Sequence, residues 1–337
     1  MKILPVSLLL FSGLLRAEDA SFASQAIATV HPLATKAGMD AFAKGGNAID
    51  AAIAAGLTLG VVDGHNSGIG GGCFFVIRAA DGTVTCLDGR EMAPAKAHRD
   101  MYVINGKLDD EASKTGALAC GVPGYLKACA AAQSKHGRLK LADVLLPAAD
   151  LAEEGFRIDE IYARKLAATA AKLAQFSSTA TIFLKNGKTL QKGQLLVQKD
   201  LAATYRAIAK NGIEWFYEGE FAQKTEAWMK ANGGMTTAAD YAAYRAPERE
   251  AIRSKYRGYE LITMPPPSSG GVHVAQILNI LENFPIRHFR ASSRVHVITE
   301  AMKLAFADRA HWLGDPDFAK VPRGLVDPAY AAELARK

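Results

Sequence analysis

The feature that most restricts how this sequence can fold is an apolar segment enclosed by glycines. Residues 48–63, AIDAAIAAGLTLGVVD, follow Gly45-Gly46 and then Asn47, a residue type suited to cap a helix. The segment is apolar on nearly every face of a helix, and such a helix is normally buried on all sides. We therefore expect a layered domain with residues 48–63 in its interior, and the 337 residues suffice to build it.

A glycine-rich turn follows directly, with five glycines between Gly64 and Gly72. Such turns often hold phosphates, but the dinucleotide motif GxGxxG needs a third glycine where Cys73 stands. The motif also needs a strand before the turn and a helix after it, which is the reverse of the order expected here. No GK[ST] sequence directly follows this turn, so the phosphate-loop motif fails too. The glycines are better explained by close backbone packing between the buried helix and the next strand.

The next two segments predict a β-hairpin. CFFVIRA and TVTCLDGRE are rich in β-forming residues, and Ala80-Asp81-Gly82 joins them with a turn signal. Residues 124–175 indicate several helices, punctuated by Pro147 and Gly155. We expect a later strand at residues 257–264, then helices at about 272–283 and 294–313. The pattern favours one mixed domain of the α+β class.

The net charge of the chain indicates which partners it can bind, and residues 1–20 indicate its cellular compartment. The net charge is +6, but the basic residues are dispersed and do not form a basic run with interleaved aromatics, so nucleic-acid binding is not expected. Residues 1–20 have the layout of a signal peptide with cleavage near Ala17 or Ala20, which predicts a periplasmic or secreted protein. A retained membrane anchor is the competing interpretation. No later segment approaches the ~20 apolar residues of a stable membrane span.

The four cysteines allow three disulfide pairings, and an exported protein can oxidise them. Cys73 and Cys86 flank the predicted hairpin, where they would face each other across it. Each cysteine nevertheless lies among apolar residues, where buried free thiols are common. No CxxC pair occurs, which argues against a zinc or redox site. We expect four buried or unpaired thiols.

Several long motifs follow one another along the chain. The first is GGNAIDAAIAAGLTLGVVDGHNSGIGGGCFFVI, residues 45–77, followed by LDGREMAPAKAHRDMY, residues 87–102. The segments GVPGYLKA, DYAAYRAPEREAI, MPPPSSGGVHVAQILNILENF and EAMKLAFADRAHWLGDPDF come next. In this order and spacing the motifs resemble one enzyme family, the gamma-glutamyltransferases (gamma-glutamyltranspeptidases, or glutathione hydrolases), whose most recognisable segment corresponds to residues 45–77. The resemblance extends from about Ala26 to Leu334.

The resemblance implies an N-terminal-nucleophile hydrolase with an αββα sandwich, made from a precursor that cuts itself into a large and a small subunit. Residues 21–337 would be the large-subunit region, and the fold would be incomplete without the small subunit. The implied reaction cleaves gamma-glutamyl amides such as glutathione through a gamma-glutamyl-threonine ester. Water, an amino acid or a peptide then accepts the glutamyl group, and no metal or organic cofactor is required.

One substrate-binding residue can be placed by this resemblance. Arg90, in LDGRE, matches the arginine that binds the α-carboxylate of the gamma-glutamyl substrate. The chemistry is suitable, because a guanidinium offers a planar fork to a carboxylate and stays charged near neutral pH. Asp88 and Glu91 are the neighbours that would orient it. Gly89 departs from the bulkier, often aromatic residue of many family members, which would loosen the packing around Arg90.

The resemblance implies no catalytic nucleophile within this chain. The nucleophilic threonine is expected downstream of Lys337, at the start of the small subunit. Thr236-Thr237 matches a large-subunit stretch and is therefore not the nucleophile. Ser268-Ser269 invites comparison with an oxyanion site, but we interpret Ser268 as a helix cap.

Other chemistry has weaker support. His296, Glu300, Asp308 and His311 lie at helical spacings, but no HExxH motif occurs, so no metal site is predicted. A GxSxG nucleophile elbow is also absent from the sequence, and His65 is interpreted as a structural hydrogen-bonding residue. Two alternatives to the transferase remain: a non-catalytic binding or scaffold protein of the family, and a related acylase.

Overall fold

The computed structural model describes residues 24–337. The signal peptide expected at residues 1–20, with its cleavage sites at Ala17 and Ala20, lies outside the described residues.

The chain begins with two packed helices, α1 (Pro32–Ala43) and α2 (Ala48–Val62). Asn47 caps α2, since its side chain accepts the amide hydrogens of Ile49 and Asp50. Most of α2 is buried, as its sequence predicted. The helix lies at the centre of the main hydrophobic core, where its side chains pack against several other helices.

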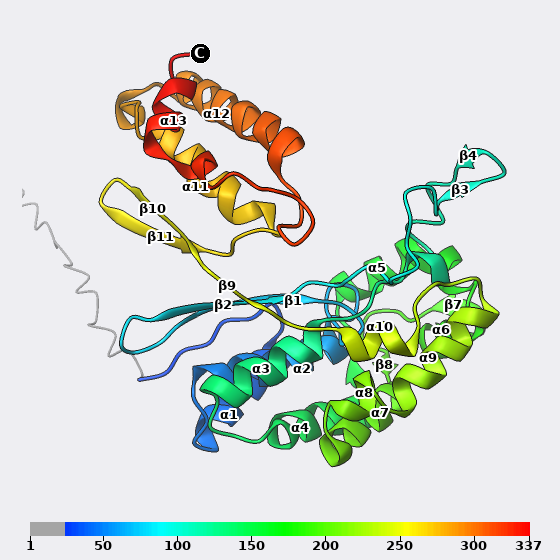
Figure 1. Cartoon of the computed structure of the whole chain (residues 1–337). Helices are drawn as coiled ribbons and strands as arrows, with labels where there is room; N and C mark the ends of the chain where they lie inside the picture. The colour runs from blue at the N-terminus through cyan, green and yellow to red at the C-terminus, as the bar shows by residue number, and fades with distance from the viewer. Residues whose placement is uncertain (1–23) are drawn as a thin grey trace, which may run out of the picture.

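A three-stranded antiparallel sheet covers one side of these helices. It is formed by β1 (Cys73–Arg78), β2 (Val84–Gly89) and β9 (Glu248–Arg249), in the order β1-β2-β9. The predicted hairpin is thus confirmed, and Gly82 in its turn adopts a φ of +86° that favours glycine. Figure 1 shows α2 and α3 (Tyr125–His136) beneath the sheet.

The register of the hairpin separates the two cysteines that the sequence placed across from each other. Cys73 pairs with Gly89, and Cys86 pairs with Val76, so the two thiols do not face each other. All four cysteines are free thiols, of which Cys86 and Cys129 are buried and Cys120 is exposed. Burial raises the pKa of the Cys86 thiol.

Helices fill the middle of the chain, as predicted. Gly155 ends α4 (Leu141–Glu154) with a φ of +82°, but the prediction that Pro147 interrupts the helices was wrong, because Pro147 lies inside α4. The remaining elements of this region are short hairpin strands and helices: β3 (Val103–Ile104), β4 (Lys107–Leu108), β5 (Phe156–Arg157), α5 (Glu160–Leu173), α6 (Ser177–Phe183), β6 (Leu184–Lys185), β7 (Lys188–Thr189), β8 (Leu195–Leu196), α7 (Lys199–Asn211), α8 (Glu214–Tyr217), α9 (Glu220–Ala231) and α10 (Ala238–Ala243).

The C-terminal part builds a second, smaller core on the opposite side of the sheet (Figure 1). Its buried residues come mainly from three helices, and a hairpin packs against α11. The elements are β10 (Ile252–Tyr256), β11 (Tyr259–Thr263), α11 (Ser269–Leu281), α12 (Ala291–Trp312) and α13 (Pro328–Leu334). The expected strand and both expected helices are present, with α11 beginning three residues earlier than predicted.

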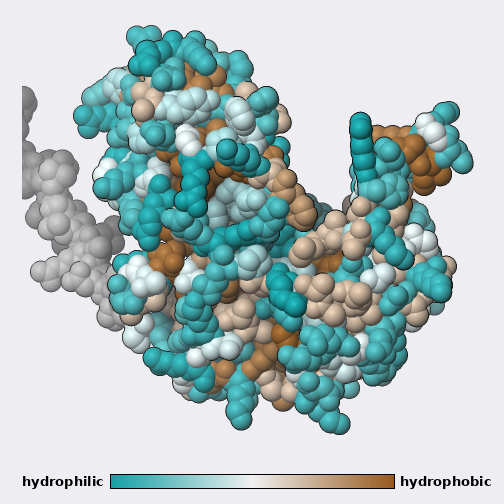
Figure 2. All heavy atoms as spheres, in the orientation of Figure 1, coloured by the Kyte–Doolittle hydropathy of each residue, from teal (hydrophilic) through white to brown (hydrophobic). Residues whose placement is uncertain are grey.

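Large apolar side chains are exposed at several places, and two of these lie on the β3–β4 hairpin and on α12. The β3–β4 hairpin projects from the body with Leu108 69% exposed, and Figure 2 shows hydrophobic residues along this hairpin. Helix α12 exposes Val295, Met302 and Phe306, which are 64%, 43% and 51% accessible. These three residues are spaced by seven and four positions, so they form one stripe along the helix. None of the helices between residues 24 and 337 combines the length and apolar character needed to cross a membrane.

Candidate substrate-binding site

Arg90 follows the last residue of β2 and lies at a surface cleft of about 230 Å³. Its side chain is 64% exposed, and its Nε lies 3.6 Å from a carboxylate oxygen of Glu91. The guanidinium is therefore accessible to a ligand from solvent. The cleft is lined by Asp88, Arg90, Glu91, Met92, Ala243, Tyr244, Arg245, Pro247, Arg249, Pro267, Asp315 and Asp317.

The backbone of Arg90 is held on both sides by buried side chains. Its N–H donates to Asp88 Oδ1 at 3.0 Å. Its carbonyl oxygen accepts a hydrogen bond of 2.7 Å from the hydroxyl of Tyr244. Asp88 is 4% exposed and Tyr244 is 1% exposed, so both hydrogen bonds are shielded from water. Asp88 thus contacts Arg90 through the peptide group rather than through the guanidinium.

Arg249 in turn fixes Asp88. Arg249 lies opposite Cys86 in the sheet, and because side chains alternate along a strand, Cys86 and Asp88 share that face. The guanidinium of Arg249 donates to Asp88 Oδ2 at 3.1 Å and forms a bidentate pair with Asp317 at 2.6 and 2.7 Å. The hydrogen bonds to Asp317 and Asp88 raise the pKa of Arg249, which keeps the ion pair intact.

The glycine-rich turn packs against the residue next to Arg90. The carbonyl of Gly71 accepts the amide hydrogens of Gly124 and Tyr125, both at 3.0 Å, and so ties the turn to the start of α3. A Cβ on Gly72 would lie 2.8 Å from Glu91 Oε2 and would also overlap the carbonyl oxygen of Gly89. The turn is therefore scaffolding that lets β1, β2 and Glu91 approach closely, as the sequence indicated.

This contact predicts a contrast between two glycine substitutions. Gly72→Ala forces the new methyl group into Gly89 and Glu91, so we expect a loss of about 1–3 kcal/mol in the free energy of unfolding. Gly70→Ala is the control, because a Cβ there meets no atom within 4 Å. Urea denaturation would measure both variants, and equal stabilities would contradict the close approach.

Gly89 itself is enclosed. A Cβ at this position would lie 2.7 Å from the Cβ of Ala128 and 2.9 Å from the carbonyl oxygen of Cys73. The sequence suggested looser packing beside Arg90 at this glycine. The structure shows instead that Ala128 of α3 occupies the space where a larger side chain would lie, so the backbone leading to Arg90 is closely packed.

The hydroxyl-bearing residues considered earlier have structural contacts. Thr237 caps α10 by accepting the amide hydrogen of Asp240 at 3.2 Å, and the buried Thr236 donates to the carbonyl of Cys120. Ser268 occupies the N-cap position of α11, but its side chain makes no capping hydrogen bond, so the predicted capping role was wrong. The neighbouring Ser269 Oγ accepts from Arg309 Nε at 3.3 Å.

The histidine and carboxylate residues do not form a metal site. Among residues 24–337, no group of three or more metal-binding side chains lies close enough to hold an ion. On α12, Glu300 pairs with Lys303, while Asp308 accepts a hydrogen bond from the hydroxyl of Tyr330. His65 Nε2 lies 3.1 Å from Asp63 Oδ1, in agreement with a structural role.

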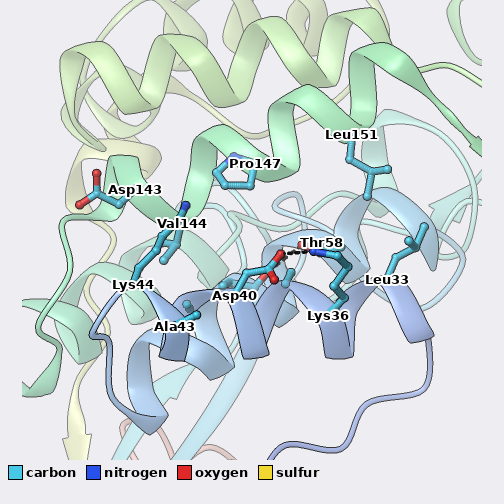
Figure 3. A pocket seen from close by; sticks show the side chains of 13 residues that line it. Leu33, Lys36, Asp40, Ala43, Lys44, Thr58, Asp143, Val144, Pro147 and Leu151 are labelled. Atoms are coloured by element: carbon cyan, nitrogen blue, oxygen red, sulfur yellow. Dashed lines mark hydrogen bonds and ion pairs between the residues drawn. The ribbon is translucent and has the colours of Figure 1, made fainter.

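A larger groove of about 500 Å³ lies between α1, α2 and α4, away from Arg90 (Figure 3). Several of its charged and polar groups are already engaged within the protein. Lys36 pairs with Asp40 at 2.6 Å, and the hydroxyl of Thr58 donates to the carbonyl of Ala54. The groove therefore offers less binding chemistry than the cleft at Arg90, whose guanidinium is open to solvent.

Two residues of the Arg90 cleft were not identified as site residues from the sequence. Tyr244 lies 154 positions from Arg90, and Arg249 lies 161 positions from Asp88. Both belong to the segment DYAAYRAPEREAI, which was noted only as a motif. No spacing rule links residues so far apart, because their proximity results from the pairing of β9 with β2.

Comparisons with known proteins agree with this fold. The sequence profile described as Gamma-glutamyltranspeptidase matches residues 34–337. The glutathione hydrolase proenzyme of Escherichia coli K12 is 44% identical over 314 residues, covering 92% of this chain and 54% of the relative. The Acylase ACY 1 proenzyme of Pseudomonas sp. V22 is also 44% identical, covering 91% of this chain and 57% of that protein. The chain thus spans about half the length of these curated relatives.

A solved structure supports the same assignment. The crystal structure of Helicobacter pylori gamma-glutamyltranspeptidase superposes with a TM-score of 0.89 at 41% identity, covering 92% of this chain and 90% of that chain. This similarity confirms the N-terminal-nucleophile hydrolase fold expected from the motifs. On the match of the family profile to residues 34–337 and on these relatives, the chain belongs to the gamma-glutamyltranspeptidase family.

Proposed function

We propose that this chain is the large-subunit part of a gamma-glutamyltransferase or glutathione hydrolase that cleaves gamma-glutamyl amides such as glutathione. The observation that carries the proposal is an exposed guanidinium, Arg90, held by its backbone at an open cleft in a chain of this family. Residues 21–337 form the large-subunit region.

Arg90 binds the α-carboxylate of the gamma-glutamyl group. The only acidic side chain within 4 Å of its guanidinium among residues 24–337 is Glu91, at 3.6 Å and partly exposed. A 3.6 Å ion pair at the surface is weak, so a substrate carboxylate can form shorter, bidentate hydrogen bonds with the planar fork. By contrast, the guanidinium of Arg249 in the same cleft is already paired with Asp88 and Asp317.

The partner of this chain is a small subunit from the same precursor, whose N-terminal threonine lies downstream of Lys337. The stripe of Val295, Met302 and Phe306 on α12 is an apolar surface of the kind that a subunit interface covers. Figure 2 also shows the surface hollowed between the α11–α13 unit and the projecting β3–β4 hairpin. The match covers 54% of the Escherichia coli relative, so a precursor of that length would have a further segment available to form this subunit.

The reaction proceeds by acyl transfer. The threonine hydroxyl attacks the γ-carbonyl carbon, and the threonine's own amino group takes the hydroxyl proton and delivers it to the departing amine. The C–N amide bond breaks as the glutamyl ester forms, and hydrogen-bond donors of the small subunit stabilise the oxyanion. Water or the amine of an amino acid or peptide then attacks the ester and regenerates the hydroxyl. No metal or organic cofactor takes part.

The protein is exported to the periplasm or secreted. The support is the charge and apolar pattern of residues 1–20, which lie outside the described part of the chain. Mass spectrometry of the mature N-terminus would show cleavage near Ala17 or Ala20.

A direct test compares the lone chain with the assembled enzyme. Purified residues 21–337 should release no p-nitroaniline from a gamma-glutamyl anilide, because the nucleophile is on the small subunit. The same chain assembled with its small subunit should release it. Turnover by the lone chain would contradict the placement of the nucleophile, and an inactive assembly would favour a non-catalytic binding or scaffold role.

A related acylase is the second candidate function. The observation in its favour is the acylase proenzyme relative, which is as identical to this chain as the glutathione hydrolase. The assembled enzyme should therefore be assayed with a gamma-glutamyl anilide and with an anilide whose acyl group lacks the α-amino and α-carboxylate groups. A higher kcat/KM for the second substrate would favour the acylase, since Arg90 has no carboxylate to bind in it.

A further inference from the structure

The Arg90 side chain is exposed, yet its peptide groups are fixed more firmly than those of an ordinary surface residue. Among the described residues, Glu91 is the only acidic side chain within 4 Å of the guanidinium, and at 3.6 Å that ion pair is loose. The close contacts, at 3.0 and 2.7 Å, go to the backbone N–H and carbonyl. Residues that position the Arg90 side chain therefore act through its backbone N–H and carbonyl groups.

We propose that Tyr244 and Asp88 are positioning residues that hold Arg90 in place for the substrate carboxylate, with Arg249 locking Asp88. The inference rests on the proposed binding role of Arg90. Tyr244 fixes the carbonyl of Arg90 and Asp88 fixes its N–H, so the peptide planes on both sides of its Cα are restrained.

Tyr244 is itself rigid. Its ring is 1% exposed and stacks on the ring of Tyr217, with centroids 5.9 Å apart and planes inclined by 21°. A Cβ on Gly124 would overlap the Tyr244 hydroxyl, which shows how closely the backbone before α3 approaches that oxygen. Burial raises the pKa of Tyr244, so the hydroxyl keeps the proton that it donates to Arg90.

Arg249 extends this arrangement to the C-terminal unit. It pairs with Asp88 on one side and, through two short hydrogen bonds, with Asp317 on the other. Asp317 lies in the segment that follows α12, so the position of Arg90 depends on contacts with the second core unit. Lysine at position 249 keeps the charge, but its single ammonium cannot reproduce the planar fork that bridges both carboxylates.

The test measures KM and kcat of the assembled enzyme with a gamma-glutamyl anilide. Tyr244→Phe removes only the hydroxyl, and we expect KM to rise about fivefold with kcat changed less than about twofold, because the carboxylate contact is equal in ground and transition states. Tyr205→Phe is the matched control. It loses a buried hydroxyl hydrogen bond of 3.1 Å to the carbonyl of Leu57, and because neither residue lines the Arg90 cleft, KM should be unchanged.

The same variants in an Arg90→Ala background separate the two proposals. There Tyr244→Phe should cause no further rise in KM, because the residue acts through Arg90. An unchanged KM for Tyr244→Phe beside a raised KM for Arg90→Ala would overturn the positioning role alone. An unchanged KM for Arg90→Ala would overturn the binding role of Arg90 and the positioning role with it. If the Tyr244→Phe enzyme fails to assemble, Arg249→Lys takes its place. It should raise KM in the otherwise unmodified enzyme and cause no further rise in the Arg90→Ala background.

Discussion

Replacing Arg90 with alanine should raise KM of the assembled enzyme for a gamma-glutamyl anilide by about tenfold or more. The reason is the loss of a charge-assisted, bidentate contact with the substrate carboxylate, which contributes roughly 1.5–3 kcal/mol. Because Arg90 is exposed and its backbone contacts do not involve the guanidinium, the alanine variant should fold and assemble normally. Steady-state kinetics over a range of substrate concentrations would measure the effect.

Arg253→Ala is a suitable control for the loss of a surface arginine. Its guanidinium pairs with Glu260 at 2.9 Å on the β10–β11 hairpin and does not line the Arg90 cleft. It should leave KM unchanged. Equal KM values for the Arg90→Ala variant and the unmodified enzyme would remove Arg90 from the binding site.

Replacing Asp50 with alanine should lower the free energy of unfolding by about 3–5 kcal/mol. Asp50 is fully buried in α2, and its carboxylate accepts hydrogen bonds from the backbone N–H groups of Asn47, Arg138 and Leu139 and from the side chain of Gln133. Alanine leaves these donors unpaired in the protein interior. Denaturant unfolding would measure the loss.

Asp143→Ala provides a matched comparison. Asp143 occupies the same third position of its helix as Asp50 and also accepts the N–H of the capping residue, Lys140, at 3.1 Å. Asp143 is exposed, however, so water can accept the hydrogen bond in its place. The Asp143→Ala variant should therefore lose only about 0.5–1 kcal/mol in the free energy of unfolding. Equal losses for the two variants would contradict a central structural role for Asp50.

The stabilisation by Asp50 should also depend on pH. Burial alone would raise the pKa of Asp50, but the hydrogen bonds from Asn47, Arg138, Leu139 and Gln133 outweigh burial and lower it. A carboxyl whose pKa is lower in the folded state stabilises the fold at pH values above its pKa in the unfolded chain. That contribution is lost as the pH falls through the folded-state pKa. The stability difference between Asp50→Ala and the unmodified protein should therefore narrow in acid.

The local elements could be predicted because their causes are local. The apolar pattern of residues 48–62, the cap at Asn47 and the turn at Gly82 each act over a few residues, and the structure places a helix and a hairpin where they indicate. The prediction that Pro147 interrupts the helices was wrong, because α4 continues through this residue. The helix is stabilised by side chains that pack on α2 and α7. Tertiary packing there outweighs the local preference of proline.

The environment of Arg90 could not be predicted in the same way. The motif identified the residue, but neither Tyr244 nor Arg249 has a sequence signal that relates it to Arg90. Their positions depend on β9 pairing with β2 and on the loop at Asp317 returning to the sheet. The exposed apolar stripe of Val295, Met302 and Phe306 on α12 likewise has no local signature, because it depends on which faces of the helix the second core leaves uncovered.

The most direct test of the proposed function is a crystal structure of the assembled enzyme with glutamate bound. Both α-carboxylate oxygens should lie about 2.7–3.0 Å from the guanidinium nitrogens of Arg90, with the γ-carboxyl group directed at the small-subunit threonine. A glutamate whose α-carboxylate is bound elsewhere, with Arg90 pointing into solvent, would contradict the assignment.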